Sequence, residues 1–421
     1  MITPLLRSRC TLLLLLAFLM LALSGRSADL GLPEKSSAAE GFSAARLDRI
    51  AVMLQREIDA QHYAGAAWLV ARDGAVVAHG AAGWRDVTTH VAMTEDSEFR
   101  IFSMTKLITT VTALTLLEEG RINLEDPVER YLPELANRQV LVGGTAESPQ
   151  LEPAKGPITI RHLLTQTSGI PYDIFAAGTL RTIWTAAGLW ESHSLKEFVG
   201  KVAKLPLAHQ PGARWTYGVN TDILGAVIEV VTGQDLQAAM QARVLGPLGM
   251  KQTTFRPDAA LLARLAMIHH RTPAGTLELD QYWGQVGEPN FLSGGGGLFS
   301  NLHDYVRFAQ MLLNGGELDG VRILGRKTVE LMTSNQIAHL DTTLAWTPPA
   351  FGFGVRIRPS QNQAGALGSI GEFGWDGACT TYVSIDPKER MVLLVLLQHA
   401  PYNEGGIFQR YSNTVYQALE K

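Results

Sequence analysis

Strand-forming sequence lies at both ends of this chain, and helix-forming sequence fills the middle. Near the N-terminus, the apolar runs AGAAWLVA and AVVAHGAA flank Arg72-Asp73-Gly74, which is a strong β-hairpin signal. Near the C-terminus, AFGFGVRIR, FGWDGACTTYVSID and MVLLVLLQ are strand-forming segments, the last two separated by a turn at Pro387-Lys388. We therefore expect the two ends to supply neighbours for each other in one antiparallel sheet.

Helices are expected beside and between these strands. Apolar residues recur at helical spacing from about Ser43, and a closing helix is expected over about 406–419. In the middle, ITIRHLLTQTS, SLKEFVGKVAKL and NTDILGAVIEVVTG alternate with loops that carry Pro and Gly. This pattern predicts an α/β (α+β) protein, with a discontinuous sheet-bearing lobe over 41–123 and 290–421 and a mostly helical lobe over 124–289. A site is expected in the cleft between the lobes.

Residues 1–28 have the composition of a secretion signal. Arg7 and Arg9 precede the apolar stretch Thr11–Leu23, which is followed by small residues. That stretch is shorter than the roughly 20 residues that a membrane-spanning helix needs. We expect an exported bacterial protein, periplasmic or secreted, without stable membrane insertion after cleavage; a retained N-terminal anchor is the alternative.

The composition argues against several other classes of protein. A net charge of −4 and the lack of a long Lys or Arg run argue against nucleic-acid binding as a function. The histidines lack the spacing of a metal site, so no metal or cofactor is expected. After signal cleavage only Cys379 remains, so no internal disulfide can form. We expect Cys379 to be a small core residue.

The segment SEFRIFSMTKLITTVTALTLLEEG predicts a helix with Ser103 at its front. Ser103 and Lys106 are three residues apart, which puts both side chains on one helix face, about 5–6 Å apart at Cβ. A serine hydroxyl becomes a good nucleophile when a neighbour accepts its proton, and a lysine whose pKa is lowered by burial can do so. Such a pair also arises by chance, and a solvated surface lysine is the alternative.

Tyr217 lies in a loop just before an apolar helix, within HQPGARWTYGVNTDILGAVIEVVTG. A phenol placed beside Lys106 and Ser103 can relay a proton to a leaving group. A tyrosine that merely packs at the start of the helix is the alternative. If the first reading holds, Ser103, Lys106 and Tyr217 form one catalytic centre.

Trp375-Asp376-Gly377 begins a strand that can run along the cleft. The backbone N–H of Ala378 can then pair with that of Ser103 as an oxyanion hole. The alternative is a glycine-rich strand with a core tryptophan.

Together these motifs resemble the serine β-lactamase and penicillin-binding-protein superfamily, whose nucleophile lies in an S-x-x-K motif. Within it the chain most resembles family VIII carboxylesterases, which look like class C β-lactamases. RHLLTQTSGIPY around His162 and GGGGLFSNLHDYVRFAQMLLNGGELDGVRIL from Gly294 support the likeness, which runs from about Ser43 to the end. It implies a β-lactamase-like α/β sandwich with an inserted all-α lobe. The roles it implies are a nucleophile at Ser103, a proton-relay pair at Lys106 and Tyr217, and a substrate-binding W-x-G motif at Trp375, Asp376 and Gly377.

The sequence departs from class C β-lactamases in two places. Those enzymes have Tyr-x-Asn, whereas here Val219 is the third residue and Asn220 comes one place late; Trp375 stands where their Lys-Thr-Gly motif has lysine. The chain therefore lacks the expected cation for a β-lactam carboxylate and the partner for its acylamide group.

We expect a serine hydrolase that cleaves short- to medium-chain carboxylic esters through an acyl-enzyme on Ser103. A β-lactamase or D,D-peptidase is the alternative, and a non-catalytic peptidoglycan-binding protein is less favoured. The expected partner is a small-molecule ester, with a β-lactam as the alternative.

Three further features carry expectations. Gly294–Gly297 is typical of a tight bend or a close backbone approach. His162 is expected to be structural. Several aromatic residues are candidates for lining an apolar acyl or alcohol pocket, with core packing as the alternative: Phe175, Trp184, Trp190, Tyr282 and Trp283.

Overall fold

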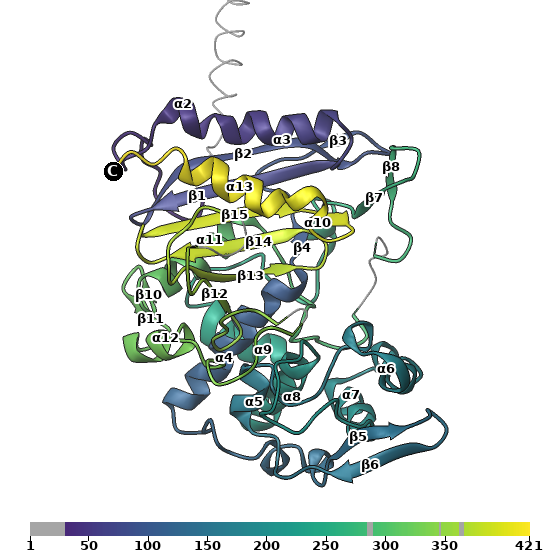
Figure 1. Ribbon diagram of the computed structural model, residues 1–421. Coiled ribbons are helices and arrows are strands. Elements are labelled where there is room, and N and C mark those ends of the chain that lie inside the picture. Colours follow the sequence, from purple (N-terminus) through teal and green to yellow (C-terminus); the bar gives the residue numbers. More distant parts are fainter. Residues whose placement is uncertain (1–29, 284–288, 345–346, 362–365) are drawn as a thin grey trace, which may run out of the picture.

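The computed structural model describes residues 30–283, 289–344, 347–361 and 366–421. Its main sheet has seven strands in the order β12-β13-β14-β15-β1-β2-β3, and every neighbouring pair is antiparallel (Figure 1). The strands are β1 (Gly65–Arg72), β2 (Ala75–Asp86), β3 (Val91–Ala92), β12 (Arg356–Ile357), β13 (Phe373–Gly377), β14 (Thr381–Asp386) and β15 (Met391–Leu397). The N-terminal hairpin pairs with the C-terminal strands through β1 and β15, as predicted.

Two C-terminal segments are more broken than their composition suggests. FGWDGACTTYVSID forms a hairpin of β13 and β14, joined by a turn in which Thr380 has φ +69°. Of AFGFGVRIR, only Arg356–Ile357 pairs with β13 as a named strand. Glycines before and within these segments shorten the strands, because they favour bends over continued pairing.

Helices cover both faces of the sheet (Figure 1). On one face lie α2 (Ala44–Leu47), α3 (Arg49–Asp59) and the closing helix α13 (Ile407–Tyr416). Trp68 and Val70 of β1 point into the core cluster under these helices. Their neighbour Leu69 points to the other face, where α11 (Leu302–Leu313) packs on β1, β14 and β15. The alternation along β1 therefore buries both sides of the strand.

Helix α4 (Thr105–Glu118) follows the short turn η1 (Phe102–Met104) and is buried from Thr105 to Leu116. The helix is confirmed, but it has no solvated face: a helix apolar nearly all round lies in the core. Its threonines are buried with satisfied hydroxyls; that of Thr112, for example, donates to the Ile108 carbonyl at 2.8 Å. Helix α4 thus passes from the sheet to the helical part, where it packs on α8.

The predicted helices of the middle region are α5 (Ile160–Leu164), α7 (Leu195–Val202) and α8 (Asn220–Thr232). An unforeseen hairpin of β5 (Gln139–Gly144) and β6 (Pro149–Pro153) lies at the far end of this region (Figure 1). The other helices are α6 (Gly178–Thr185), α9 (Leu236–Met240), α10 (Ala259–Leu262) and α12 (Arg326–Met332), with a π-helical turn η6 (Gln241–Leu245). Short 3₁₀ turns are η2 (Val128–Arg130), η3 (Pro133–Leu135), η4 (Asp173–Phe175), η5 (Leu189–Glu191) and η7 (Glu404–Gly406).

Small sheets complete the fold. β7 (His269–Arg271) pairs with β8 (Leu277–Leu279) and, in parallel, with β16 (His399–Ala400). Two-stranded pairs are β4 (Phe99–Arg100) with β9 (Phe299–Ser300), and β10 (Glu317–Leu318) with β11 (Val321–Arg322). Among the residues that the structure describes, no helix has both the length and the apolar character needed to cross a bilayer.

Candidate active site

Ser103 lies in the turn η1, between the sheet and the buried helix α4. The residue before it, Phe102, has φ +43°, a left-handed conformation that costs free energy in a residue other than glycine. Hydrogen bonds hold both sides of this turn. The Ile101 N–H donates to the Leu298 carbonyl at 3.0 Å, and the Thr381 hydroxyl of β14 donates to the Ile101 carbonyl at 3.2 Å. The backbone that presents Ser103 is therefore fixed from outside the turn.

Lys106 is almost fully buried, with 1% of its surface exposed. Its ammonium group donates to the Ser103 hydroxyl at 3.2 Å, the Tyr172 hydroxyl at 3.0 Å and the Gly295 carbonyl at 2.6 Å. An ammonium group has three N–H donors, so these three acceptors satisfy it completely. The sequence prediction that Ser103 and Lys106 share one face is realised as a direct contact.

The pKa of Lys106 is raised. Burial by itself lowers the pKa, but the oxygens of Tyr172 and Tyr217 and the carboxyl group of Asp222 act in the opposite direction and outweigh it. The sequence-based expectation that burial alone would give a low-pKa lysine is wrong, because it left out these neighbours. The resting state of Lys106 is the ammonium form.

Tyr172 was not singled out from the sequence, yet its hydroxyl is a direct partner of Lys106. It ends the phrase RHLLTQTSGIPY, whose backbone is tied to the start of α8. The Tyr172 N–H donates to the Tyr217 carbonyl at 3.1 Å, and the buried Asn220 amide donates to the Gln166 side chain at 2.8 Å and the Ile170 carbonyl at 3.2 Å. Burial raises the pKa of Tyr172, so its hydroxyl stays protonated.

Tyr217 lies beside the same centre in a different orientation. Its ring faces Lys106, with the ammonium nitrogen 4.7 Å from the ring centroid, and its hydroxyl accepts from the Trp375 indole N–H at 3.1 Å. The structure thus brings Ser103, Lys106 and Tyr217 together. In this state the ammonium group donates to the Tyr172 hydroxyl, and the Tyr217 hydroxyl links the centre to β13.

Strand β13 brings the W-D-G motif against the nucleophile turn. A Cβ on Gly377 would lie 2.6 Å from the Ile101 carbonyl oxygen and would also overlap the Thr381 hydroxyl, so only glycine allows this approach. Ala378 follows at the exposed end of the strand. Among the described residues, neither the Ser103 N–H nor the Ala378 N–H makes a backbone hydrogen bond outside the helices and strands. The oxyanion hole at these two groups stays a prediction.

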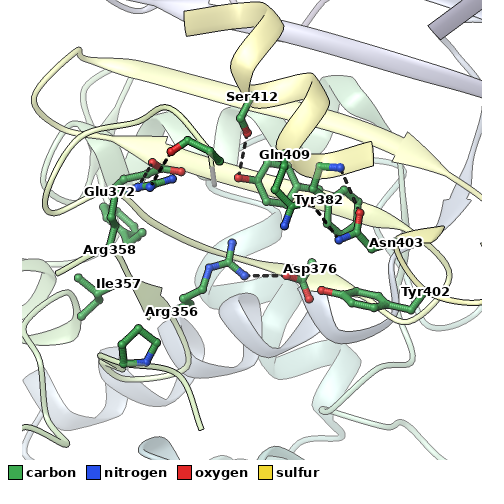
Figure 2. Close-up of a pocket in the computed structure, with 14 residues that line it drawn as sticks. Arg356, Ile357, Arg358, Glu372, Asp376, Tyr382, Tyr402, Asn403, Gln409 and Ser412 are labelled. Carbon is green, nitrogen blue, oxygen red and sulfur yellow. Dashed lines mark hydrogen bonds and ion pairs between the residues drawn. The ribbon is translucent and has the colours of Figure 1, made fainter. Parts of the chain in front are cut away.

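Asp376 lies on the opposite face of β13 from Trp375, as strand alternation demands. Its carboxylate accepts from Arg356 at 2.7 Å and forms part of the wall of a cavity of about 230 Å³. Figure 2 shows Asp376 pointing towards Arg356 and Tyr402 in this cavity, and none of the three predicted catalytic side chains lines it. In the W-D-G motif, Trp375 and Gly377 thus face the Ser103 centre, whereas Asp376 faces the outer cavity.

The five aromatic candidates divide into three groups. Phe175 and Trp190 lie at the centre: Phe175 is 5.6 Å from the Tyr217 ring, and Trp190 stacks at 6.1 Å on Tyr172. Trp184 is a core residue of the helical region, where its indole donates to a backbone carbonyl.

Trp283 packs edge-on against Phe102, the residue before the nucleophile, at 5.4 Å. Tyr282 is 79% exposed and contacts Trp283. Of the five candidates, Phe175 and Trp190 therefore contact the two tyrosines beside Lys106, and Trp283 contacts the residue before the nucleophile.

Other expectations concern structural residues. Cys379 is buried beside Phe102, and burial raises the pKa of its thiol to about 12, so it is a core residue and not a nucleophile. His162 is structural: its ring nitrogen accepts from the Thr159 N–H at 3.1 Å and caps α5. The described residues contain no group of His, Cys, Asp or Glu side chains that could hold a metal ion.

The glycine run 294–297 forms the close approach that was predicted for it. The Gly294 carbonyl accepts from Thr109 at 2.7 Å, and that of Gly295 accepts from Lys106. The run therefore supplies backbone acceptors to helix α4.

The chain matches the beta-lactamase family over residues 50–416. It belongs to this family. The match confirms the resemblance inferred from the motifs and covers both the strand-rich ends and the helical middle.

Relatives within the beta-lactamase family include acyl-transfer enzymes and esterases. The chain is 33% identical to monacolin J acid methylbutanoyltransferase of Aspergillus terreus, over 73% of this chain and 78% of that protein. It is 37% identical to esterase EstB of Burkholderia gladioli, over 50% of this chain and 51% of that protein. The solved structure of EstCE1, described as a hydrolase with promiscuous acyltransferase activity, has a TM-score of 0.74 at 25% identity and covers 90% of this chain and 99% of its own.

Proposed function

We propose that this protein is a serine hydrolase that cleaves short- to medium-chain carboxylic esters through an acyl-enzyme on Ser103. The observation that carries the proposal is the 3.2 Å contact between the Lys106 ammonium nitrogen and the Ser103 hydroxyl oxygen, in a pocket that leaves Lys106 1% exposed. A nucleophile in direct contact with a buried amine is the arrangement that covalent catalysis by serine needs.

Acylation begins when the Ser103 oxygen attacks the ester carbonyl carbon. The serine proton passes to Lys106 in its neutral form, which is the minor form because its pKa is raised. The N–H groups of Ser103 and Ala378 bind the oxyanion. The bond to the alcohol oxygen then breaks, and that oxygen takes a proton from Lys106 through the hydroxyl of Tyr172 or Tyr217.

Deacylation uses the same groups in reverse roles. Once the alcohol has left, water takes its place and gives a proton to neutral Lys106 as it attacks the acyl carbonyl. The oxyanion binds the same two N–H groups, and Ser103 regains its proton as the acid departs. The reaction needs no metal and no organic cofactor.

The surroundings of Ser103 favour an apolar, uncharged ester. Phe175, Trp190, Tyr172 and Tyr217 form a continuous aromatic wall, and Trp375 occupies the place where class C enzymes have a lysine. Aromatic walls stabilise apolar acyl or alcohol groups through burial. A carboxylate-bearing β-lactam would gain less here, so β-lactam hydrolysis or D,D-peptidase activity is a secondary activity in this proposal. The intact Ser103 centre argues against a purely binding role.

Acyl transfer to an alcohol is a second candidate activity. It is favoured by the relationship to monacolin J acid methylbutanoyltransferase, which spans about three quarters of each chain. The acyl-enzyme is common to both reactions; an acceptor alcohol bound against the aromatic wall would attack in place of water.

The test is to measure initial rates of the purified mature protein with p-nitrophenyl butyrate and nitrocefin, with and without an added alcohol. Ser103→Ala is the test variant. Ser192→Ala is the matched control, because Ser192 is a buried serine whose hydroxyl donates only to the Leu189 carbonyl within the described chain. Ester turnover lost in Ser103→Ala and kept in Ser192→Ala supports the proposal. Dominant nitrocefin turnover would make the protein a β-lactamase, and ester turnover that survives in Ser103→Ala would overturn the proposed centre.

Export is part of the proposal and rests on the sequence of residues 1–28. The full chain expressed in a Gram-negative host should be recovered from the periplasm with a new N-terminus near residue 28. An unprocessed chain in the membrane fraction would indicate a retained anchor instead.

A further inference from the structure

Asp222 is a buried carboxyl group that the reaction scheme above does not use. It lies in the first turn of α8 and is 0% exposed. One carboxyl oxygen, Oδ1, accepts from the Ser293 hydroxyl at 2.5 Å and from the Gly295 N–H at 3.0 Å. The other, Oδ2, has no hydrogen-bond partner among the described residues. A buried, half-satisfied carboxyl group is costly, and such groups are kept where they serve a function.

Gly295 connects Asp222 to Lys106. Its N–H donates to Asp222, and its carbonyl accepts from the Lys106 ammonium group at 2.6 Å. A Cβ at position 295 would overlap Asp222 Oδ2 and would lie 3.0 Å from the Tyr172 hydroxyl. Oδ2 therefore borders the same small space as the phenol that accepts from Lys106, and glycine is needed to keep that space open.

The charges of the two side chains complement each other. Lys106 is a buried ammonium group, and burying a cation is unfavourable unless an anion compensates it. The groups that face Lys106 are Ser103, the phenols of Tyr172 and Tyr217, and the carboxyl group of Asp222, whose charge raises the Lys106 pKa. Burial raises the pKa of Asp222 above its usual range, and Lys106 and the bonds from Ser293 and Gly295 offset only part of that rise.

We propose that Asp222 is the counter-ion and positioning residue of Lys106, acting through Gly295. Its carboxylate fixes the Gly295 carbonyl against the ammonium group, and its charge sets the pH at which Lys106 becomes a neutral base. The proposal rests on the nucleophilic role proposed for Ser103. It does not require that the natural substrate is an ester.

Labelling by a fluorophosphonate tests the centre independently of ester turnover. In this reaction the Ser103 oxygen attacks phosphorus, the P–O bond forms, the P–F bond breaks, fluoride leaves, and the serine proton goes to neutral Lys106. The rate of labelling at Ser103, measured by intact-mass spectrometry across a pH series, therefore reports the protonation state of Lys106.

Two substitutions separate charge from position. Asp222→Asn keeps an oxygen that accepts from Ser293 and Gly295 but removes the charge; the Lys106 pKa falls, and the rise of the labelling rate moves to lower pH by about one unit. Asp222→Ala removes the acceptor as well, so the Gly295 carbonyl is no longer fixed, and the labelling rate at high pH falls by about tenfold. If Asp222→Ala does not fold, Asp222→Asn still tests the charge.

Asp304→Asn is the matched control. Asp304 is also a buried aspartate that accepts from one N–H, of Gln252 at 2.7 Å, and one hydroxyl, of Thr253 at 2.9 Å. A purely structural loss lowers the melting temperature in both variants and leaves the pH profile in place. A profile of Asp222→Asn that coincides with the parent's would overturn the counter-ion role, and a folded Asp222→Ala that labels as fast as the parent would overturn the positioning role.

The same assay distinguishes the two proposals. In one outcome, the parent protein does not hydrolyse p-nitrophenyl butyrate, while the pH profile of its labelling still shifts in Asp222→Asn. That result would remove the esterase function and support the role of Asp222. Ester turnover by the parent, with a labelling profile that Asp222→Asn leaves unshifted, would support the esterase function and remove the role of Asp222. No labelling of the parent at Ser103 would overturn both.

Discussion

The two sides of the Ser103 centre differ in composition: one is formed by side chains and the other mainly by backbone. On the proton-handling side, the buried Lys106 and Asp222 and the partly buried Tyr172 come from three separate segments and meet around Gly295. On the oxyanion side, β13 contributes mainly backbone, and Ala378, which follows its last residue, is exposed. The first side depends on the identity of each side chain, whereas the second depends on how closely two stretches of backbone approach.

This difference determines how each side can fail. A buried polar network loses most when one member is removed, because its partners are left unsatisfied in a medium of low dielectric. A backbone site survives most side-chain changes and fails when a substitution alters the distance between the segments. Substitutions on the two sides should therefore differ in the size of their effects. On the first side they disrupt a polar network, and on the second they change the distance between two backbone segments.

The largest effect is expected from Lys106→Met, which keeps the length of the side chain and removes its charge. Turnover of p-nitrophenyl butyrate should fall by about 10³-fold, with little change in KM, because the proton acceptor is lost while the pocket keeps its shape. Lys201→Met is the control, since Lys201 also donates to a glycine carbonyl, that of Gly188 at 2.9 Å, away from the centre. Equal losses in both variants would remove Lys106 from the chemistry.

Gly377→Ala tests the oxyanion side. The added Cβ would meet the Ile101 carbonyl and the Thr381 hydroxyl, so β13 must move away from the nucleophile turn. We expect kcat to fall by about 10²-fold, as when one oxyanion donor is lost. Gly200→Ala in α7, where a Cβ meets nothing within 4 Å, should keep full activity. A Gly377→Ala variant with parental kcat would show that this side tolerates displacement.

Tyr172→Phe and Tyr217→Phe compare two phenols on the proton-handling side. Tyr172→Phe leaves Lys106 with one unsatisfied donor, so kcat should fall by about tenfold or more. Tyr217→Phe keeps the ring against the ammonium group and loses only the bond to the Trp375 indole. A smaller loss is expected there, and kcat over pH from both variants is the measurement. The reverse order would make Tyr217 the main proton relay, as the motif by itself implies.

The same contrast explains what the sequence could predict. Ser103 and Lys106 are three residues apart, in the turn η1 and in the first turn of α4 that follows it, so local geometry alone places them together. The pairing of β1 with β15 followed from strands that needed partners. Tyr172 and Asp222 are far from Lys106 in the chain, and only the packing of α8 against α4 and of α5 against α8 brings them to it. Residue spacing carries no signal for such contacts.

The pKa of Lys106 was mispredicted for the same reason. Burial could be foreseen from an apolar helix, but the sign of the shift depends on the two phenols and the carboxyl group that surround the amine. The glycine run gave the clearest usable signal, because four successive glycines indicate a close backbone approach. That signal locates the approach and leaves open which side chains it serves.

The smallest effect is expected from Asp376→Asn, on the outer face of β13. The W-D-G motif by itself assigns Asp376 to substrate binding, but its carboxylate pairs with a partly exposed Arg356 in the outer cavity (Figure 2). Losing this pair should lower the free energy of unfolding by about 1 kcal/mol or less, and kcat/KM for p-nitrophenyl butyrate should stay within about twofold of the parent value. Urea denaturation and initial rates measure the two quantities. A tenfold loss of kcat/KM would instead mean that the substrate reaches around β13 into this cavity. The cavity would then be a third side of the centre, next to the proton-handling side and the oxyanion side.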